Sequence, residues 1–367
     1  MIRHALALAL FVSTVASAQI TAFGNLGSGT TTWSGTVTVT GDVTIPSDGT
    51  LIIQPGTVVT ANATDSQGSG DVTTKPELLV LGVLNVSGVS GGGVTFTGAG
   101  SGTQAWGGIV VRAGGSATIS YATIDEMSAG IKAQLGGVGV VTNLVISNSS
   151  ISGSEYGVRT ASSGAGGTLT ATLTGVTFNG CLQNGLDHEA AGAVNVTDSS
   201  FSGGTTSYAI YQSAGTLSLT TSRVTNNTYA VYIAGGTSSS FDRCTIAFNS
   251  STSVAGIDTF VSSGATTVTS SVITQNGTYG VRRGNGGSIS VTSSNVWGNS
   301  NTFGPPPTNN ANLIGFNYSG TVSQNNNKSE NPLFVDPVAH LVQRGVGEGR
   351  RAARAHDDAG PRLRAAA

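Results

Sequence analysis

A four-residue pattern recurs seven times between residues 129 and 282, and its copies are spaced 21 to 28 residues apart. The second residue of the pattern is always Gly or Ala, and the third is always Ile, Leu or Val. The seven copies begin at Ala129, Tyr156, Asn184, Tyr208, Tyr229, Ala255 and Tyr279. A repeat of this length without helical periodicity is typical of a solenoid, in which successive coils stack and share one apolar core.

A second apolar column repeats in step with the first. Its members lie 22 to 27 residues apart and are Ile124, Ile151, Phe178, Phe201, Val224, Ile246, Ile273 and Val296. In the last four copies an Asn follows three residues later, at Asn227, Asn249, Asn276 and Asn299. Asn suits a recurring sharp turn and can form a ladder of stacked amides. The two columns predict an all-β chain that folds as a parallel β-helix, with three short strands in each of seven to eight coils over residues 116–300.

Residues 19–115 are expected to form less regular coils of the same stack. Apolar and polar residues alternate in three runs, 37–45, 51–59 and 78–96, which is the pattern of strands with one face inward. Residues 62–75 are polar and rich in Gly, Ser and Asp, and we expect a loop that protrudes from a coil. None of the nine prolines lies between Pro76 and Pro305, as expected for central strands that donate hydrogen bonds to a neighbouring coil.

Three segments resemble sequences of exported bacterial right-handed parallel β-helix proteins of the pectin-lyase-like superfamily. They are LIIQPGTVV at residues 51–59, WGGIVV at 106–111 and NPLFVDP at 331–337. The resemblance spans residues 35–337 and implies a right-handed solenoid in one elongated domain, which a segment over residues 301–337 closes. Because this superfamily holds lyases, hydrolases and adhesins, the resemblance implies a fold and leaves the activity open.

The two ends of the chain differ from this body. Arg3 and His4 precede an apolar run that ends in Ala16-Ser17-Ala18, the pattern of a secretory signal peptide over residues 1–18. This run is too short to span a bilayer, so we expect a secreted protein of the extracellular space, periplasm or cell surface. Residues 338–367 hold six of the sixteen basic residues and no apolar period, and this Arg- and Ala-rich tail is expected to pack poorly.

Composition narrows the range of partners. Charged residues are 9% of the chain and the formal net charge is −2, which gives no indication of nucleic-acid binding. Cys181 and Cys244 fall three coils apart, roughly 14 Å along the axis, which is beyond disulfide reach. No His/Cys group has metal-ligand spacing and no glycine-rich loop precedes a helix, so no metal or other cofactor is expected. We expect a monomer without a membrane-spanning segment.

Candidate chemistry gathers in one column of the repeat. If the aliphatic residue of the four-residue pattern points inward, the residue after it points outward. This outward column reads Lys132, Arg159, Asp187, Tyr211, Tyr232, Asp258 and Arg282 from coil to coil. One interpretation is a solvated face that carries the pairs Arg159–Asp187 and Asp258–Arg282. The other is a shallow glycan-binding track formed by Lys132, Arg159, Asp187, Tyr211 and Tyr232. The adjacent cations Lys132 and Arg159 repel each other unless Glu155, Asp187 or an acidic polysaccharide offsets their charge.

An enzymatic alternative centres on residues 187–189. A polysaccharide lyase needs a base and a cation that neutralises a uronate carboxylate. His188 or Tyr211 is the candidate base beside Asp187, and Arg159 or Lys132 is the candidate cation. However, the alternation that turns Asp187 outward turns His188 inward. Asp187 and Asp258 lie three coils apart, too far for hydrolysis by paired carboxylates. The sequence therefore favours an exported, non-catalytic surface, adhesion or glycan-binding module, and the alternative is a polysaccharide lyase or glycoside hydrolase with an atypical site.

Overall fold

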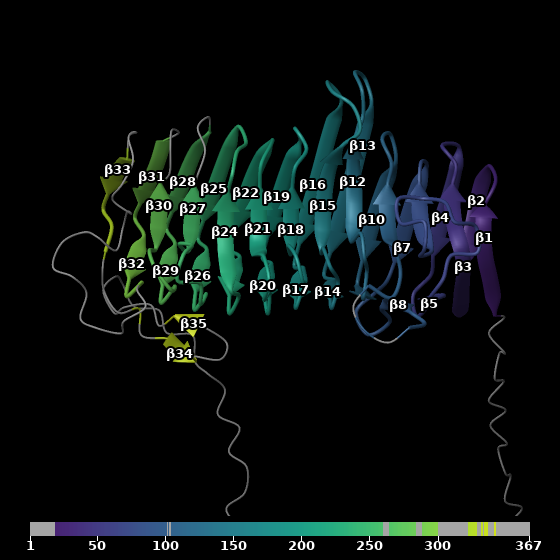
Figure 1. The fold of residues 1–367 in the computed structure, drawn as a ribbon, viewed down its shortest axis with the longest axis horizontal. Coiled ribbons are helices and arrows are strands. Elements are labelled where there is room, and N and C mark those ends of the chain that lie inside the picture. The colour runs from purple at the N-terminus through teal and green to yellow at the C-terminus, as the bar shows by residue number, and fades with distance from the viewer. Residues whose placement is uncertain are drawn as a thin grey trace, which may run out of the picture. The chain divides into compact units, whose positions relative to one another are not determined.

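The computed structural model describes residues 19–100, 102, 104–259, 264–283, 288–299 and 322–328, together with 332, 334–336 and 341–342. The predicted signal peptide lies outside these residues. The chain divides into a large unit over residues 1–331 and a small unit over residues 332–367. In the large unit, strands stack coil upon coil into three parallel rows, called here rows A, B and C (Figure 1). The part of the chain that the structure describes contains no helix.

Row C is a separate twelve-stranded parallel sheet. Its strands are β2 (Gly29–Trp33), β4 (Gly49–Ile53), β7 (Val83–Ser87), β10 (Ser116–Ser120), β13 (Val141–Ser147), β16 (Thr168–Thr174), β19 (Ala193–Thr197), β22 (Thr216–Thr220), β25 (Ser238–Asp242), β28 (Ala265–Thr269), β31 (Ser288–Thr292) and β33 (Val322–Asn325).

Rows A and B form one 21-stranded sheet because the long strand β3 (Thr36–Ile45) pairs with the first strand of each row. The strand β1 (Ile20–Asn25) also pairs with β3. Row A consists of β5 (Val58–Ala61), β8 (Val94–Gly98), β11 (Ala122–Asp125), β14 (Ser150–Ser152), β17 (Thr177–Asn179), β20 (Ser200–Ser202), β23 (Arg223–Thr225), β26 (Thr245–Ala247), β29 (Val272–Thr274) and β32 (Asn295–Trp297). Row B consists of β6 (Glu77–Val80), β9 (Gly108–Val111), β12 (Ile131–Leu135), β15 (Val158–Ser162), β18 (Leu186–His188), β21 (Tyr208–Gln212), β24 (Tyr229–Ile233), β27 (Ile257–Thr259) and β30 (Val281–Arg283).

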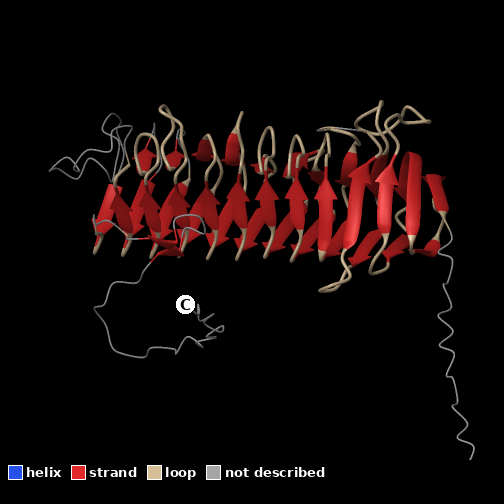
Figure 2. Ribbon diagram, turned by 90° about the horizontal axis from the view of Figure 1, so that it is seen from below, coloured by secondary structure: helices blue, strands red, loops and turns tan. Residues whose placement is uncertain are grey.

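Each coil passes through row C, then row A, then row B, and the same rows of successive coils lie side by side (Figure 2). Between β10 and β30 the chain makes seven such coils, and β31 and β32 begin another. The parallel β-helix predicted from the two apolar columns is therefore confirmed, including its three strands per coil.

The two apolar columns form the core in the register that the sequence predicts. Members of the first column pair in order from Ile131 to Val281, and those of the second from Ile124 to Val296. All are buried, and the rings of Phe178 and Phe201 stack with centroids 4.4 Å apart. Burial of each such side chain contributes roughly 1.5–3 kcal/mol. Apolar stacking between coils therefore fixes the register that the sequence repeat predicts.

The predicted asparagine ladder is present, but its turn chemistry differs from expectation. Each side-chain amide donates to the carboxamide oxygen of the next, over 3.1 Å from Asn227 to Asn249 and 2.8 Å for the following two steps to Asn299. The left-handed residue of the turn is the one before the ladder position, for example Phe248 with φ of 57°. The buried Asn side chains therefore stabilise the turn from inside, while their neighbours adopt the strained backbone.

Both cysteines are unpaired and buried, as predicted. Cys181 takes the same position after its strand as the ladder asparagines, and Cys244 takes a position that serine holds in neighbouring coils, where Ser222 and Ser271 lie. Burial raises the pKa of each thiol to about 12, so both stay protonated at neutral pH. Cohesion between coils comes from packing and hydrogen bonds rather than from cross-links.

In the small unit, β34 (Phe334–Asp336) and β35 (Leu341–Val342) form an antiparallel pair. Apart from Leu341 and Val342, the tail over residues 338–367 lies outside the described residues. The expectation that this tail packs poorly stays a prediction.

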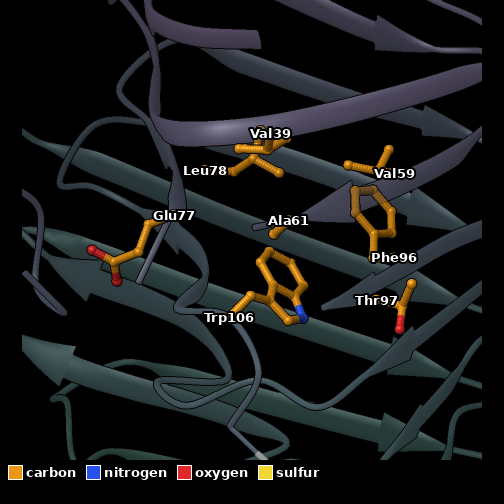
Figure 3. A pocket seen from close by; sticks show the side chains of 8 residues that line it. All are labelled: Val39, Val59, Ala61, Glu77, Leu78, Phe96, Thr97 and Trp106. Carbon is orange, nitrogen blue, oxygen red and sulfur yellow. The ribbon is translucent and has the colours of Figure 1, made fainter. Parts of the chain in front are cut away.

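Two aromatic side chains pack among aliphatic residues in the interior of the first coils. The rings of Phe96 and Trp106 stack with centroids 6.2 Å apart. Together with Val59 and Leu78 they surround a space that has no room for a water molecule (Figure 3). The carboxyl group of Glu77 points away from the two rings (Figure 3). The first coils thus have a dry core, and the acidic side chain at their edge belongs to a polar network.

Candidate functional site

The predicted outward column forms a continuous ladder along row B. Its members pair in the order Lys132, Arg159, Asp187, Tyr211, Tyr232, Asp258 and Arg282, one on each successive coil. Their strands begin with the buried aliphatic residue of the four-residue pattern or hold it near their start, which turns the next side chain away from the core. The structure therefore brings together all the side chains predicted for the track. We call this surface the row B face.

Four tyrosines cluster at the centre of the row B face. The rings of Tyr211 and Tyr232 stack with centroids 6.0 Å apart, and Tyr208 lies 4.7 Å from Tyr232 and 6.0 Å from Tyr211. Tyr229 completes the cluster at 5.5 Å from Tyr208. All four side chains are half-buried, so each ring keeps an exposed part. The tyrosine cluster therefore presents a partly exposed aromatic surface that spans two neighbouring coils.

Tyr208 and Tyr229 were not among the predicted site residues. The signal that could have identified them is the first position of the four-residue pattern, which is Tyr in four of the seven copies. Two consecutive copies carry Tyr at both the first and the fourth position. Because the strands pair in register, this repetition places four rings in contact.

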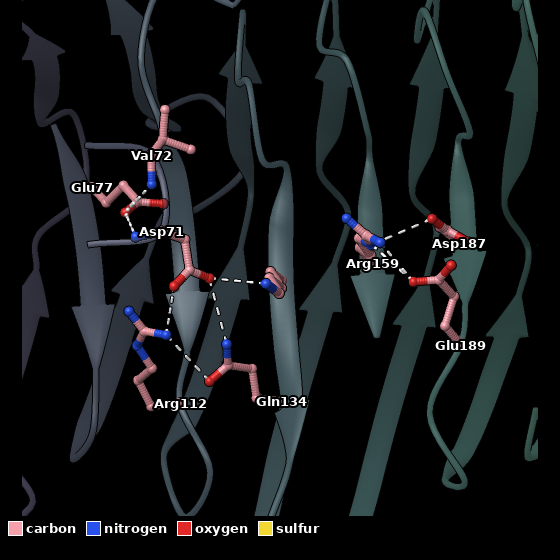
Figure 4. Close-up of polar contacts among 9 residues, drawn as sticks. Asp71, Val72, Glu77, Arg112, Gln134, Arg159, Asp187 and Glu189 are labelled. Carbon is pink, nitrogen blue, oxygen red and sulfur yellow. Dashed lines mark hydrogen bonds and ion pairs between the residues drawn. The ribbon is translucent and has the colours of Figure 1, made fainter. Parts of the chain in front are cut away.

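An aspartate–arginine pair flanks the tyrosine cluster on each side. Arg159 contacts Asp187 at 3.4 Å and Glu189 at 2.7 Å, and its guanidinium faces both carboxylates (Figure 4). On the other side, Arg282 forms an ion pair with Asp258. Both pairs predicted for a solvated face are thus present. The arginines stay partly exposed, but the aspartates are not solvated, because Asp187 is 2% exposed and Asp258 is 1% exposed. Alternation sets the direction of these short side chains, but it does not set how exposed they are.

Burial changes the protonation of these groups. Desolvation raises the pKa of Asp187 to about 6, and the nearby Glu189 acts in the same direction while Arg159 opposes it. Burial also raises the pKa of Asp258 against the effect of Arg282. Desolvation raises the pKa of Tyr208 and Tyr232 above the usual value for a phenol. These two hydroxyls are therefore neutral near pH 7 and can donate hydrogen bonds.

His188 points into the solenoid, as the alternation predicts. Its side chain is fully buried, and its Nδ1 atom lies 2.8 Å from the hydroxyl oxygen of Thr160 on the preceding coil. Burial lowers the pKa of His188 to about 4. The imidazole therefore cannot reach a ligand on the row B face, which removes it as a base for chemistry there. The candidate catalytic residues that remain on this face are Asp187, Arg159, Lys132 and Tyr211.

The basic end of the column has a partner that the sequence did not indicate. Asp71 lies 2.9 Å from the amine of Lys132 and 2.7 Å from the guanidinium of Arg112 (Figure 4). It belongs to the loop over residues 62–75, most of which is exposed, and its side chain reaches row B. The repulsion expected between Lys132 and Arg159 is therefore offset within the protein. Asp71 forms an ion pair with Lys132, and Asp187 and Glu189 form ion pairs with Arg159.

A sequence model of the right handed beta helix region matches residues 142–303, which include the row B face from Arg159 to Arg282. This match agrees with the parallel rows and the coil order of the structure. The fold is a right-handed parallel β-helix.

Two solved structures resemble this β-helix. The periplasmic alginate epimerase AlgG is 12% identical with a TM-score of 0.44, and the match covers 81% of this chain and 76% of the epimerase. A double mutant of the same epimerase is 11% identical with a TM-score of 0.43, over 81% and 77% of the two chains. These values carry no information on the activity of this β-helix. A comparison with curated proteins finds no match.

Within the described ranges, no three His, Cys, Asp or Glu side chains are placed to hold a metal ion together. The same residues include no helix that is long and apolar enough to cross a membrane. The side chains of the row B face supply aromatic rings, hydroxyl groups and paired charges.

Proposed function

We propose that this β-helix is an exported, non-catalytic binding module that holds a glycan along its row B face. The observation that carries the proposal is the tyrosine cluster, because its rings contact one another, are half-buried and repeat on neighbouring coils. Tyrosine combines an apolar ring with a polar hydroxyl, which suits a sugar that has both an apolar face and a rim of hydroxyls. The pattern of residues 1–18 supports export.

The spacing of the coils fits a chain of several sugars. Strands of neighbouring coils lie about 4.8 Å apart, so the four steps from Lys132 to Tyr232 span about 19 Å. Arg159 and Glu189 lie on the same face and stay half-exposed, so they can hydrogen-bond to sugar hydroxyls. In this arrangement the tyrosine rings supply affinity and the polar groups fix the orientation of the glycan.

The test is a double substitution, Tyr211→Ala with Tyr232→Ala, in the mature protein. Loss of two stacking rings at about 0.5–1.5 kcal/mol each is expected to lower glycan affinity roughly tenfold. Binding is measured by calorimetry with the glycans that a panel of acidic and neutral polysaccharides identifies. Tyr121→Ala is the matched control, because Tyr121 is exposed at a turn between rows C and A.

The two variants should also have the thermal stability of the wild type within a few degrees, since the removed rings lie outside the core. Unchanged affinity of the folded double variant for every glycan would show that the row B face is only a surface. Arg159→Ala is a poor test, because it would leave Asp187 buried without its cation and destabilise the fold.

One observation favours a catalytic alternative. Asp187 is buried against Arg159, its pKa is raised to about 6, and it pairs in register with Tyr211. A carboxyl group of this kind can exchange a proton near neutral pH, as a polysaccharide lyase or glycoside hydrolase requires. Incubation with the same panel, followed by detection of unsaturated or shortened products, distinguishes the two functions. Products that the wild type forms and Asp187→Asn does not form would establish the enzyme.

A further inference from the structure

Three donor side chains converge on Asp71 at the basic end of the row B face. The guanidinium of Arg112 binds one carboxylate oxygen at 2.7 Å. The amine of Lys132 binds the other oxygen at 2.9 Å, and the amide of Gln134 approaches that oxygen at 3.4 Å. Arg112 follows β9, while Lys132 and Gln134 lie on the adjacent strand β12. Row B thus forms a site that receives both oxygens of a carboxylate.

The loop over residues 62–75 holds Asp71 over these donors. The carboxylate of Glu77 accepts hydrogen bonds from the backbone N–H groups of Asp71 and Val72, at 2.5 and 3.1 Å. Asp42 accepts from the hydroxyl of Ser69 at 2.5 Å. Gly70 lies against Glu77 so closely that a Cβ atom there would clash with its carboxylate, and its φ of +76° also favours glycine. The loop is therefore folded to deliver one acidic side chain to row B.

We propose that Arg112, Lys132 and Gln134 form a subsite for the carboxylate of an acidic sugar, and that Asp71 occupies this subsite in the free protein. The inference rests on the proposed glycan-binding function and names its ligand class, a polymer of uronic acids. Lys132 pairs in register with Arg159, so the subsite continues the ladder that leads to the tyrosine cluster. A uronate bound there would lie at the end of the same track.

Several features suit an exchange of carboxylates. The side chains of Arg112, Lys132 and Asp71 keep 26%, 19% and 22% of their surface exposed, so a ligand can reach them. Gln134 is buried and holds its amide in place beneath them. Although burial raises the pKa of Asp71, hydrogen bonds from Lys132 and Arg112 lower it below the usual value. Asp71 thus stays ionised near neutral pH and competes with any anionic ligand.

This competition makes the subsite selective. A uronate carboxylate can replace Asp71 because it offers the two cations the same charge and geometry. A neutral sugar or a methyl-esterified uronate offers no such charge, and it leaves Asp71 in place. Only an acidic polymer can therefore displace Asp71 and bind at this end of the track.

The test compares the wild-type mature chain with Asp71→Asn, using polygalacturonate and fully methyl-esterified polygalacturonate at low salt. Asp71→Asn frees both cations and is expected to raise affinity for polygalacturonate roughly five- to tenfold. Affinity for the methyl ester should stay unchanged. Asp48→Asn is the matched control, because it removes one exposed charge from the first coils without contacting Arg112 or Lys132. Addition of Lys132→Gln to Asp71→Asn should remove the gain.

The outcomes separate this inference from the proposed function. If Asp71→Asn binds polygalacturonate no better than the wild type, the carboxylate subsite is wrong, whatever the tyrosine variants do. An equal gain with the methyl ester would also overturn it, since general opening of the loop would then explain the effect. A gain restricted to the acid form supports the subsite even if the tyrosine double variant binds normally, in which case the tyrosine track is the part that fails.

Discussion

Two adjacent residues of β18 face opposite sides of the coil, and their pKa values move in opposite directions. Asp187 points to the row B face, where burial raises its pKa from 3.8 to about 6. His188 points into the core, where burial lowers its pKa from 6.5 to about 4. Each of these pKa changes corresponds to roughly 3 kcal/mol between the protonation states. Both groups titrate in one window, and their effects on stability oppose each other.

The signs follow from proton binding in the two states. Between pH 6.5 and 4 the unfolded chain protonates its histidine while folded His188 stays neutral, so stability falls as the pH falls. Over the same range folded Asp187 takes up a proton while the unfolded carboxyl group stays ionised until about pH 3.8, so stability rises as the pH falls. Exchange of either residue for a group that does not titrate should expose the effect of the other.

We therefore predict that His188→Gln gains stability relative to the wild type as the pH is lowered from 7 to 4.5. The expected relative gain is up to about 3 kcal/mol, because the variant has no imidazole that takes up a proton when the chain unfolds. Urea unfolding at several pH values measures the difference. Asp187→Asn should show the opposite trend, losing stability relative to the wild type over this range. If the unfolding free energies of both variants change with pH as that of the wild type does, His188 and Asp187 do not control the pH dependence of stability.

At the scale of the element, the turn after row A depends on the asparagine ladder. Asn276 accepts from the amide of Asn249 at 2.8 Å, and it donates to Asn299 at 2.8 Å and to the carbonyl of Ile246 at 3.0 Å. Its side chain is 1% exposed, so water cannot replace these partners. Removal of one member leaves donors and acceptors of its neighbours buried without partners.

Asn276→Ala is accordingly expected to lower the free energy of unfolding by about 2–4 kcal/mol, which is the range for several buried polar groups left unpaired. Chemical denaturation measures the loss. Asn195→Ala is the matched control, since Asn195 is exposed on β19 and its change should stay within about 0.5 kcal/mol. Equal losses from the two substitutions would mean that a ladder asparagine contributes no more to the free energy of unfolding than an exposed asparagine does.

The arrangement of the strands could be predicted from the sequence, whereas some contacts of the row B face could not. The rows, the register and the outward column could be predicted from the sequence. Each coil must place an aliphatic side chain beneath that of the next coil, and alternation along the strand then turns the following residue outward. The contact between Asp71 and Lys132 was not predictable, since it joins residues 61 positions apart through a loop without apolar period. The burial of Asp187 was missed for a related reason. Alternation sets where a side chain points, but not how exposed it is.

At the scale of the whole solenoid, each coil is stabilised mainly by its contacts with the two neighbouring coils. The described cysteines are unpaired, and each coil of the large unit contacts mainly the coils before and after it. Such a chain responds to a defect locally, with an effect that fades along the axis. The stacked rings of Phe178 and Phe201 are a suitable place to introduce one, because they join two central coils.

Phe201→Ala is expected to cost about 3–5 kcal/mol, as for other buried phenylalanine side chains. Hydrogen exchange of the folded variant should show the largest loss of protection in the coils of β17, β20 and β23. The first coils, with β5 and β8, should keep most of their protection. Phe23→Ala is the control, because Phe23 is 60% exposed on β1 and contributes little to the core. A uniform loss of protection from β1 to β32 would show instead that the solenoid unfolds as one cooperative unit. In that case the substitution would also weaken the distant carboxylate subsite, whereas local transmission leaves Arg112 and Lys132 in place.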